Sequence, residues 1–373
     1  MRHLSRPVRL TTASAAACLL LLAAGCAAVP ADAVPDSSAD QGGCRDLTPG
    51  RPAGATRHLH GERRLMGTSF QIRVIASDAG RGCQAIDEAF GEVARQEALF
   101  SEYRDSSEIS AVNRAAGGTP VEVDAEVFGL LRRSAWISRL TSGAFDVTFA
   151  GCGRLWSVRE QRIPDDDALA ACLEHVGYAR LRFDERQSSV GLPDPEMRIG
   201  LGGIAKGSGV DRAADVLVAR GFSSFVVDGG GDMRVEGRDV EGPWTIHIAH
   251  PRRPDEVFDT IQLNHGSIVT SGDYLRYFER DGVRYHHILD PSTGRPARRS
   301  VSVTVIAPTA TDADGLATGL FVLGPERGLE VVASLPGVSA LYFAPDLSVH
   351  ASPGFPRGLR AASHNPAFVP ETP

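Results

Sequence analysis

Apolar residues recur along this chain at two spacings, one of two residues and one of three to four. The stretch 66–76 follows the first, with Phe70, Ile72 and Val74 on one face, which predicts a strand. The same reasoning predicts later strands over 222–227, 244–249, 301–307 and 339–343.

The second spacing predicts helices. One covers about 84–99, and another begins at an Asp124 cap and ends at Leu140. Ser106 or Ser107 is placed to cap a short helix that leads to Asn113. Near the end of the chain, helices are predicted over 309–323 and 325–335.

The order of these elements bounds the fold class. Strands alternate irregularly with helices and glycine turns, which favours an α+β (mixed α/β) fold over a doubly wound Rossmann sheet. We expect two intimately packed lobes of mixed sheets and helices within residues 58–351.

A glycine-rich stretch at 199–211 precedes an apolar, helix-periodic run. Glycines let a backbone approach a ligand closely, and free N–H groups at a helix start attract anions. Lys206 adds a positive charge there. The spacing matches neither GxGxxG nor a P-loop, so a phosphate-bearing ligand and a tightly packed turn both remain open.

Asp314 and Thr318 are spaced i, i+4 on a predicted helix and so share one face. A carboxylate beside a hydroxyl offers two hard oxygen ligands suited to Mg²⁺. The alternative is structural, with a capping Asp and a Thr bonded back to its own helix. Asp146 is similarly open, since its carboxylate can accept from ligand hydroxyls or from backbone N–H groups.

Two adjacent histidines, His286 and His287, precede the turn sequence 290–294. On an extended segment they point to opposite faces, so one can face a site while the other is structural. A third histidine or cysteine at metal-ligand spacing is missing, which disfavours a histidine zinc site. A general base or positioning group is the better interpretation for one of them.

The beginning of the chain carries an export pattern. Residues 1–26 combine arginines, an apolar run and small residues before Cys26, which indicates a lipoprotein signal peptide with Cys26 as the lipidated residue. Ordinary secretion is the alternative. Residues 27–57 are predicted to be a disordered tether and 352–373 a Pro-rich disordered tail.

Charge and cysteine content bear on the binding partners and on the disulfide bonds of the protein. The net charge of −7 and the lack of basic clusters argue against a nucleic-acid partner. Four of the six cysteines lie beyond the signal and can pair in three ways, of which Cys44–Cys83 with Cys152–Cys172 is preferred.

Taken together, these stretches resemble the ApbE family, the FAD:protein FMN transferases. The matching segments occur in the family's order and span about residues 65–335. They are 66–68, 101–113, 142–148, 202–211, 271–274, 287–294 and 314–318.

The resemblance implies an exported, membrane-anchored lipoprotein facing the periplasm or exterior. It would move FMN from FAD to a Thr or Ser hydroxyl of an exported acceptor protein and release AMP. His287 would act as the base, and Mg²⁺ would be held by Asp314, Thr318 and the carbonyl of Gly203. FAD, bound between the lobes, would be contacted by Met66, Tyr103, Ala144, Phe145, Asp146, Lys206 and Leu289.

One position departs from the family pattern. The family usually carries an Asp that touches the flavin nucleotide where this chain has Gly200. Two alternative functions therefore stay open, a Mg²⁺-dependent FAD pyrophosphatase that yields FMN and AMP, and a non-catalytic flavin-binding lipoprotein. A redox flavoenzyme is disfavoured, because a nicotinamide-binding fingerprint is missing.

Overall fold

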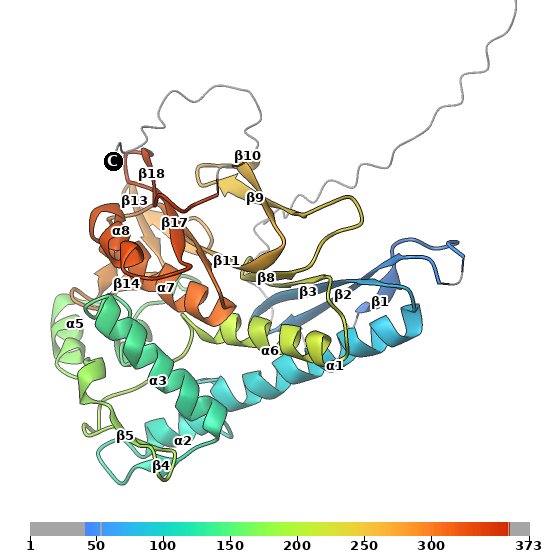
Figure 1. The fold of residues 1–373 in the computed structure, drawn as a ribbon. Coiled ribbons are helices and arrows are strands. Elements are labelled where there is room, and N and C mark those ends of the chain that lie inside the picture. The colour runs from blue at the N-terminus through green and yellow to red at the C-terminus, as the bar shows by residue number, and fades with distance from the viewer. Residues whose placement is uncertain (1–41, 53, 357, 359–373) are drawn as a thin grey trace, which may run out of the picture.

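The computed structural model describes residues 42–52, 54–356 and 358. Its largest element is a nine-stranded sheet whose neighbouring strands are all antiparallel (Figure 1). In spatial order the strands are β1 (Gly42–Asp46), β2 (Arg57–Leu65), β3 (Thr68–Ala76), β7 (Phe225–Gly229), β8 (Met233–Glu236), β11 (His265–Gly272), β16 (Ser302–Ala307), β17 (Ser339–Phe343) and β18 (Val349–Ala351). The predicted α+β class is confirmed, and both halves of the chain share this sheet.

Four smaller sheets contain the other strands of the described residues. They are formed by β4 (Val121–Glu122), β5 (Arg182–Asp184) and β6 (Ser189–Gly191), by β9 (Trp244–His250) and β10 (Arg253–Leu263), by β12 (Tyr277–Arg280) and β13 (Val283–His286), and by β14 (Leu289–Asp290) and β15 (Arg295–Pro296).

The α-helices are α1 (Ala79–Phe100), α2 (Glu108–Arg114), α3 (Ala125–Leu140), α4 (Ala150–Gly153), α5 (Asp166–Leu173), α6 (Ala205–Ala219), α7 (Ala310–Leu323) and α8 (Pro325–Ala333), with a 3-10 helix at Tyr178–Arg180. Within the described ranges, no helix combines the length and apolar character needed to cross a membrane.

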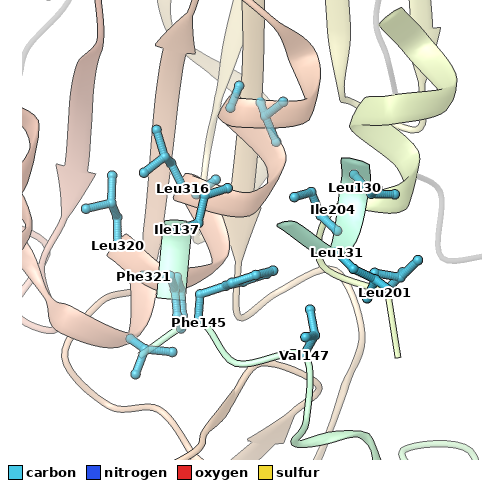
Figure 2. Close-up of a cluster of buried hydrophobic side chains, with 14 of the residues drawn as sticks. Leu130, Leu131, Ile137, Phe145, Val147, Leu201, Ile204, Leu316, Leu320 and Phe321 are labelled. Carbon is cyan, nitrogen blue, oxygen red and sulfur yellow. The ribbon is translucent and has the colours of Figure 1, made fainter. Parts of the chain in front are cut away.

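Three hydrophobic clusters hold these elements together. Helices α1 and α6 cover one face of β2, β3 and β7, where Phe70, Ile72 and Val74 are fully buried as predicted. The β9–β10 hairpin packs through a second cluster that includes Trp244 and Phe343. The third cluster surrounds α7 and joins it to α3 and to the segment before α6 (Figure 2).

The predicted strand 66–76 is wrong at its first two residues. Met66 and Gly67 have φ angles of 49° and 74° and form the turn between β2 and β3. Positive φ at both central residues is the two-residue hairpin geometry that matches the twist of the flanking strands. The alternation was real, but it begins at Thr68.

The helix predictions hold with small changes at their ends. Helix α1 begins earlier than expected, because the Asp78 side chain accepts a hydrogen bond from the amide of Arg81. Of the two serines proposed to cap α2, Ser107 does so. Asp124 caps α3 as predicted.

The folded region is longer than the predicted 58–351. The predicted tether is wrong from Gly42 onward, because β1 pairs with β2 and Cys44 is bonded to Cys83 in α1. The predicted tail is wrong at its start, where Phe355 is buried in the cluster under the β9–β10 hairpin. The predicted signal peptide and Cys26 lie outside the described residues.

Both preferred disulfides are confirmed. Cys44–Cys83 spans 39 residues of chain, and Cys152–Cys172 spans 20 and links α4 to α5. The first bond ties the short strand β1 to the long helix α1, and the second joins two short helices. Crosslinks of this kind stabilise mainly by restricting the unfolded chain.

Candidate active site

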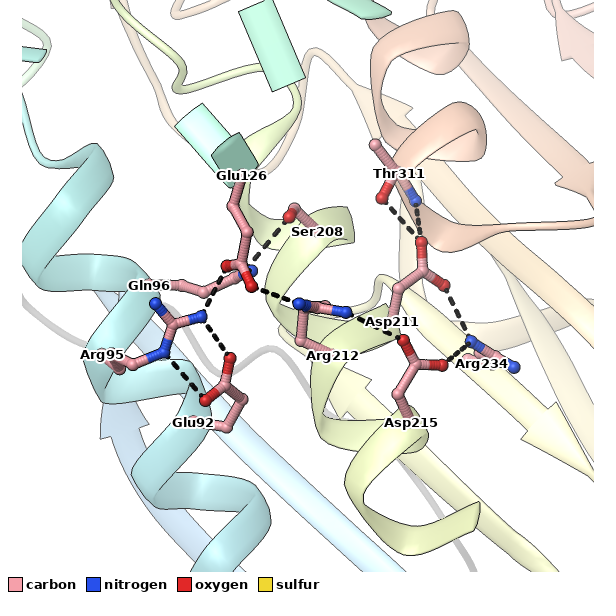
Figure 3. Close-up of polar contacts among 10 residues, drawn as sticks. All are labelled: Glu92, Arg95, Gln96, Glu126, Ser208, Asp211, Arg212, Asp215, Arg234 and Thr311. Atoms are coloured by element: carbon pink, nitrogen blue, oxygen red, sulfur yellow. Dashed lines mark hydrogen bonds and ion pairs between the residues drawn. The ribbon is translucent and has the colours of Figure 1, made fainter. Parts of the chain in front are cut away.

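The candidate site lies where α6 crosses α7. At Gly207 the helices approach so closely that a Cβ would lie 2.2 Å from the carbonyl oxygen of Ala310. The side chain of Asp211, one turn later, accepts a hydrogen bond from the amide of Ala310 at 2.9 Å. It also accepts one from the amide of Thr311 at 2.8 Å (Figure 3). The glycine-rich stretch thus serves first to bring two helix starts together.

This crossing places two buried carboxylates around one ammonium group. Nζ of Lys206 lies 2.5 Å from Oδ2 of Asp232 and 3.2 Å from Oδ1 of Asp314. The other oxygen of Asp314 accepts a hydrogen bond from the Gly207 amide at 3.0 Å. Two carboxylates against one ammonium leave the cluster with an excess of negative charge when all three are ionised.

The electrostatics of the cluster follow from this arrangement. Burial alone would lower the pKa of Lys206, but the charges of Asp232 and Asp314 outweigh it, so the pKa is raised and the amine stays protonated. Burial, and next the charge of Asp314, raise the pKa of Asp232 well above its ordinary value. A cation bound near both carboxylates would relieve this repulsion.

The hydroxyl of Thr318 is directed away from its own helix. Its Oγ1 lies 3.5 Å from the carbonyl oxygen of Gly203, on the chain that leads into α6. Asp314 does not cap α7, because Thr309 does. Asp314 nevertheless has a structural role, because its carboxylate accepts from the Gly207 amide in the first turn of α6, whereas the Thr318 hydroxyl is paired with the Gly203 carbonyl rather than with its own helix.

Asp314, Thr318 and the Gly203 carbonyl fit a Mg²⁺ ion in chemistry and in charge. All are hard oxygen donors, and the adjacent Asp232 adds negative charge. A group of three or more His, Cys, Asp or Glu side chains suited to a metal does not occur in the described part of the chain. The oxygen ligands here are of three kinds, one carboxylate, one hydroxyl and one backbone carbonyl, and Mg²⁺ accepts all of them.

His287 lies on the exposed side of the segment after β13. Its Nδ1 is 3.2 Å from the carbonyl oxygen of Arg276, which can only accept, so Nδ1 carries the proton and Nε2 is left with a free lone pair. Desolvation and, next, the charge of Arg276 lower the pKa of His287 to about 4, and the charge of Lys206 acts in the same direction. The imidazole is therefore neutral near pH 7.

His286 points the opposite way, as the alternation predicts. It is buried, its Nε2 donates to the carbonyl of Ala297 at 2.8 Å, and its Nδ1 accepts from the amide of Ile288 at 3.3 Å. Both ring nitrogens are thus satisfied within the fold. His286 is a structural residue.

The residues expected to contact FAD come from several separate elements of the fold. Phe145 is buried close to Gly203, and Met66 packs beside Gly209 in α6. Ala144 and Leu289 are half-buried, and Tyr103 is 84% exposed on a separate loop.

The Asp146 carboxylate is already occupied by the fold. It accepts hydrogen bonds from the amide and hydroxyl of Thr148 at 2.8 and 2.6 Å and from the amide of Tyr178 at 3.0 Å. Of the two roles left open for Asp146, the structure favours the one toward backbone N–H groups.

Sequence reasoning missed two residues of this site. One is Asp232, for which an acidic residue directly after the strand β7 and its glycine turn was a usable signal. Asp211 was read only as the end of the glycine-rich stretch, and its capping of α7 has no local signal. Its partners lie about 100 positions away.

Known proteins share this fold and sequence. The pattern of the ApbE family matches residues 66–342. An FAD:protein FMN transferase of Treponema pallidum is 37% identical over 312 residues, covering 78% of this chain and 85% of its own, and one of Vibrio cholerae is 38% identical, covering 74% and 83%.

Solved structures agree. The flavin transferase ApbE from Vibrio cholerae superimposes with a TM-score of 0.72 at 32% identity, covering 80% of this chain and 98% of its own. The ApbE protein of Thermotoga maritima gives 0.72 at 35% identity, covering 79% and 97%. The chain belongs to the ApbE family. The resemblance seen in the sequence, and with it the assignment to the transferases, is confirmed.

Proposed function

We propose that this protein is a Mg²⁺-dependent FAD:protein FMN transferase that moves FMN from FAD to a Thr or Ser hydroxyl of an exported acceptor protein and releases AMP. The observation that carries this proposal is the cluster of Lys206, Asp232 and Asp314 at the α6–α7 crossing. It stands with the neutral imidazole of His287, whose pKa the charge of Lys206 helps to lower. Together they combine a phosphate-attracting cation, oxygen ligands and a neutral base.

Asp314, Thr318 and the carbonyl of Gly203 would hold Mg²⁺. When bound, the ion would neutralise the negative charge that spreads over the phosphoryl oxygens during transfer. Lys206 adds a fixed positive charge beside them, and its two carboxylate partners hold the ammonium in place. Such preorganised charges act without reorganisation during the reaction.

His287 supplies the proton acceptor. The acceptor hydroxyl gives its proton to the free Nε2 as its oxygen forms a bond to the FMN phosphorus. The bond from that phosphorus to the bridging oxygen breaks, and AMP leaves with that oxygen. A positioned base of this kind contributes about 10²–10⁴-fold to the rate.

Location follows from the export pattern at the beginning of the chain. We propose that Cys26 is lipidated and that the protein is anchored at the cell membrane, facing the periplasm or exterior. The two disulfides support this, because such bonds persist in oxidising compartments.

The test is to incubate the protein with FAD, Mg²⁺ and an exported acceptor protein that contains a Thr or Ser flavinylation motif. We expect covalent flavin on the acceptor and AMP in solution, and both are lost in Asp314→Ala. If only free FMN and AMP form, the enzyme is a pyrophosphatase. Turnover that persists in Asp314→Ala would contradict the assigned role of that residue.

A further inference from the structure

Glu102 carries a carboxylate that the mechanism above does not use. Its side chain is only 13% exposed, and within the described residues its carboxylate meets one cation, Arg154, at 3.4 Å. That distance is long for a charge-assisted hydrogen bond, which measures about 2.7–2.9 Å. Burial raises the pKa of Glu102, although the Arg154 guanidinium acts against that rise. The carboxylate is thus nearly buried and weakly paired.

The space for this carboxylate exists because residue 200 is glycine. A Cβ at Gly200 would lie 2.6 Å from Oε1 of Glu102 and 2.9 Å from the Cβ of Ala150. The backbone there is held in place, since the Gly200 amide donates to the carbonyl of Val147 at 2.9 Å. The end of the Glu102 side chain therefore occupies the volume that a side chain at position 200 would otherwise fill.

This position adjoins the candidate active site. Gly200 is three residues before Gly203, so the two lie within about 10 Å along the chain. Tyr103, directly after Glu102, is 84% exposed, which is unusual for a large aromatic ring. A carboxylate at this place repels phosphate groups but accepts hydrogen bonds from neutral donors.

We propose that Glu102 binds a neutral hydrogen-bond donor of the bound dinucleotide, a sugar hydroxyl or an amino group, and that Gly200 leaves the space for it. The identity of the dinucleotide as FAD rests on the proposed function. Glu102 is a binding residue in this proposal. Its carboxylate, which comes from the loop after α1, lies where a side chain of residue 200 would otherwise be.

The first test is Glu102→Ala, with FAD affinity measured by quenching of flavin fluorescence in EDTA, where no transfer takes place. Loss of a hydrogen bond to a charged group corresponds to about a ten- to hundredfold weaker affinity. FMN titrated in the same way, and AMP titrated as a competitor of bound FAD, show which half carries the donor. The matched control is Glu97→Ala, which removes the ion pair of Glu97 with Arg104 on the same loop and should leave FAD affinity unchanged.

The second test moves the carboxylate. Gly200→Asp alone should weaken FAD binding, because the new side chain collides with Glu102 and Ala150. The relocation variant combines Gly200→Asp with Glu102→Ala and Ala150→Gly, which removes both obstacles. We expect it to recover most of the affinity lost in Glu102→Ala, a gain that a purely structural role of Glu102 would not produce.

The outcomes separate the inference from the proposed function. Wild-type affinity in Glu102→Ala, or a relocation variant that binds FAD no better than Glu102→Ala, would overturn the inference and leave the transferase proposal intact. A wild-type protein that binds FAD without transferring flavin would sink only the transferase proposal. A wild-type protein that binds FAD neither in EDTA nor with Mg²⁺ would overturn both.

Discussion

The backbone amide of Gly207 donates a 3.0 Å hydrogen bond to the carboxylate of Asp314, and this contact joins α6 to α7 at the centre of the site. It is possible only because residue 207 has no side chain. A Cβ there would lie 2.8 Å from the Cβ of Asp314 and closer still to the carbonyl of Ala310. The geometry of the Lys206–Asp314 pair therefore depends on one glycine.

The first prediction follows directly. Gly207→Ala should lower the free energy of unfolding by about 1–3 kcal/mol through overpacking and abolish Mg²⁺-dependent turnover. The matched control is Gly129→Ala in α3, where a new Cβ meets nothing within 4 Å. That change should stabilise by about 0.5–1 kcal/mol, because alanine is the better helix former. Denaturant unfolding of both variants makes the comparison, and equal stabilities would contradict the close crossing.

Asp232 shares Lys206 with Asp314, so its removal should change how tightly Asp314 is held. In Asp232→Asn the ammonium has Asp314 as its remaining carboxylate partner in the cluster and competes more strongly with a divalent cation. We expect the Mg²⁺ concentration for half-maximal activity to rise by roughly tenfold, the equivalent of about 1.4 kcal/mol. Asp215→Asn, on the exposed side of α6, should leave this requirement unchanged. If Asp232→Asn left the Mg²⁺ concentration for half-maximal activity unchanged, Asp232 would have no part in Mg²⁺ binding.

The acid limb of the pH profile should lie below the usual histidine range. Because the pKa of His287 is lowered from 6.5 to about 4, its neutral form persists as pH falls and turnover is lost only as pH drops through about 4. Arg276→Gln removes the second-largest cause and should move the midpoint upward, with desolvation still acting. The measurement is kcat against pH for both proteins. A midpoint that does not move would exclude Arg276 as a cause.

The Cys152–Cys172 bond should matter for stability more than for chemistry. It closes a loop of 20 residues, so replacing both cysteines by alanine should lower the free energy of unfolding by about 3 kcal/mol. The Cys44–Cys83 bond closes a longer loop of 39 residues, so replacing both of its cysteines should cost at least as much. Thermal unfolding with and without reductant checks both, and a wild-type protein indifferent to reductant would contradict the prediction.

Much of the local structure was predictable because its causes are local. Asp124 and Ser107 cap helices through amides two or three residues away, and the alternation of Phe70, Ile72 and Val74 reflects the strand itself. One error was local, since Met66 and Gly67 form a hairpin turn that the alternation does not reveal. Gly42–Asp46 looked like linker because its composition does not show the strand β2 and the Cys83 with which it pairs.

The sequence by itself determined that Asp314 and Thr318 share one helical face and that His286 and His287 face apart, because helix and strand periods dictate both. Only the tertiary structure decided what those faces meet. It placed Asp232 against Lys206 and set Glu102 in the space left by Gly200. Such contacts join segments 26 to about 100 residues apart, and they depend on packing distances that no local pattern encodes.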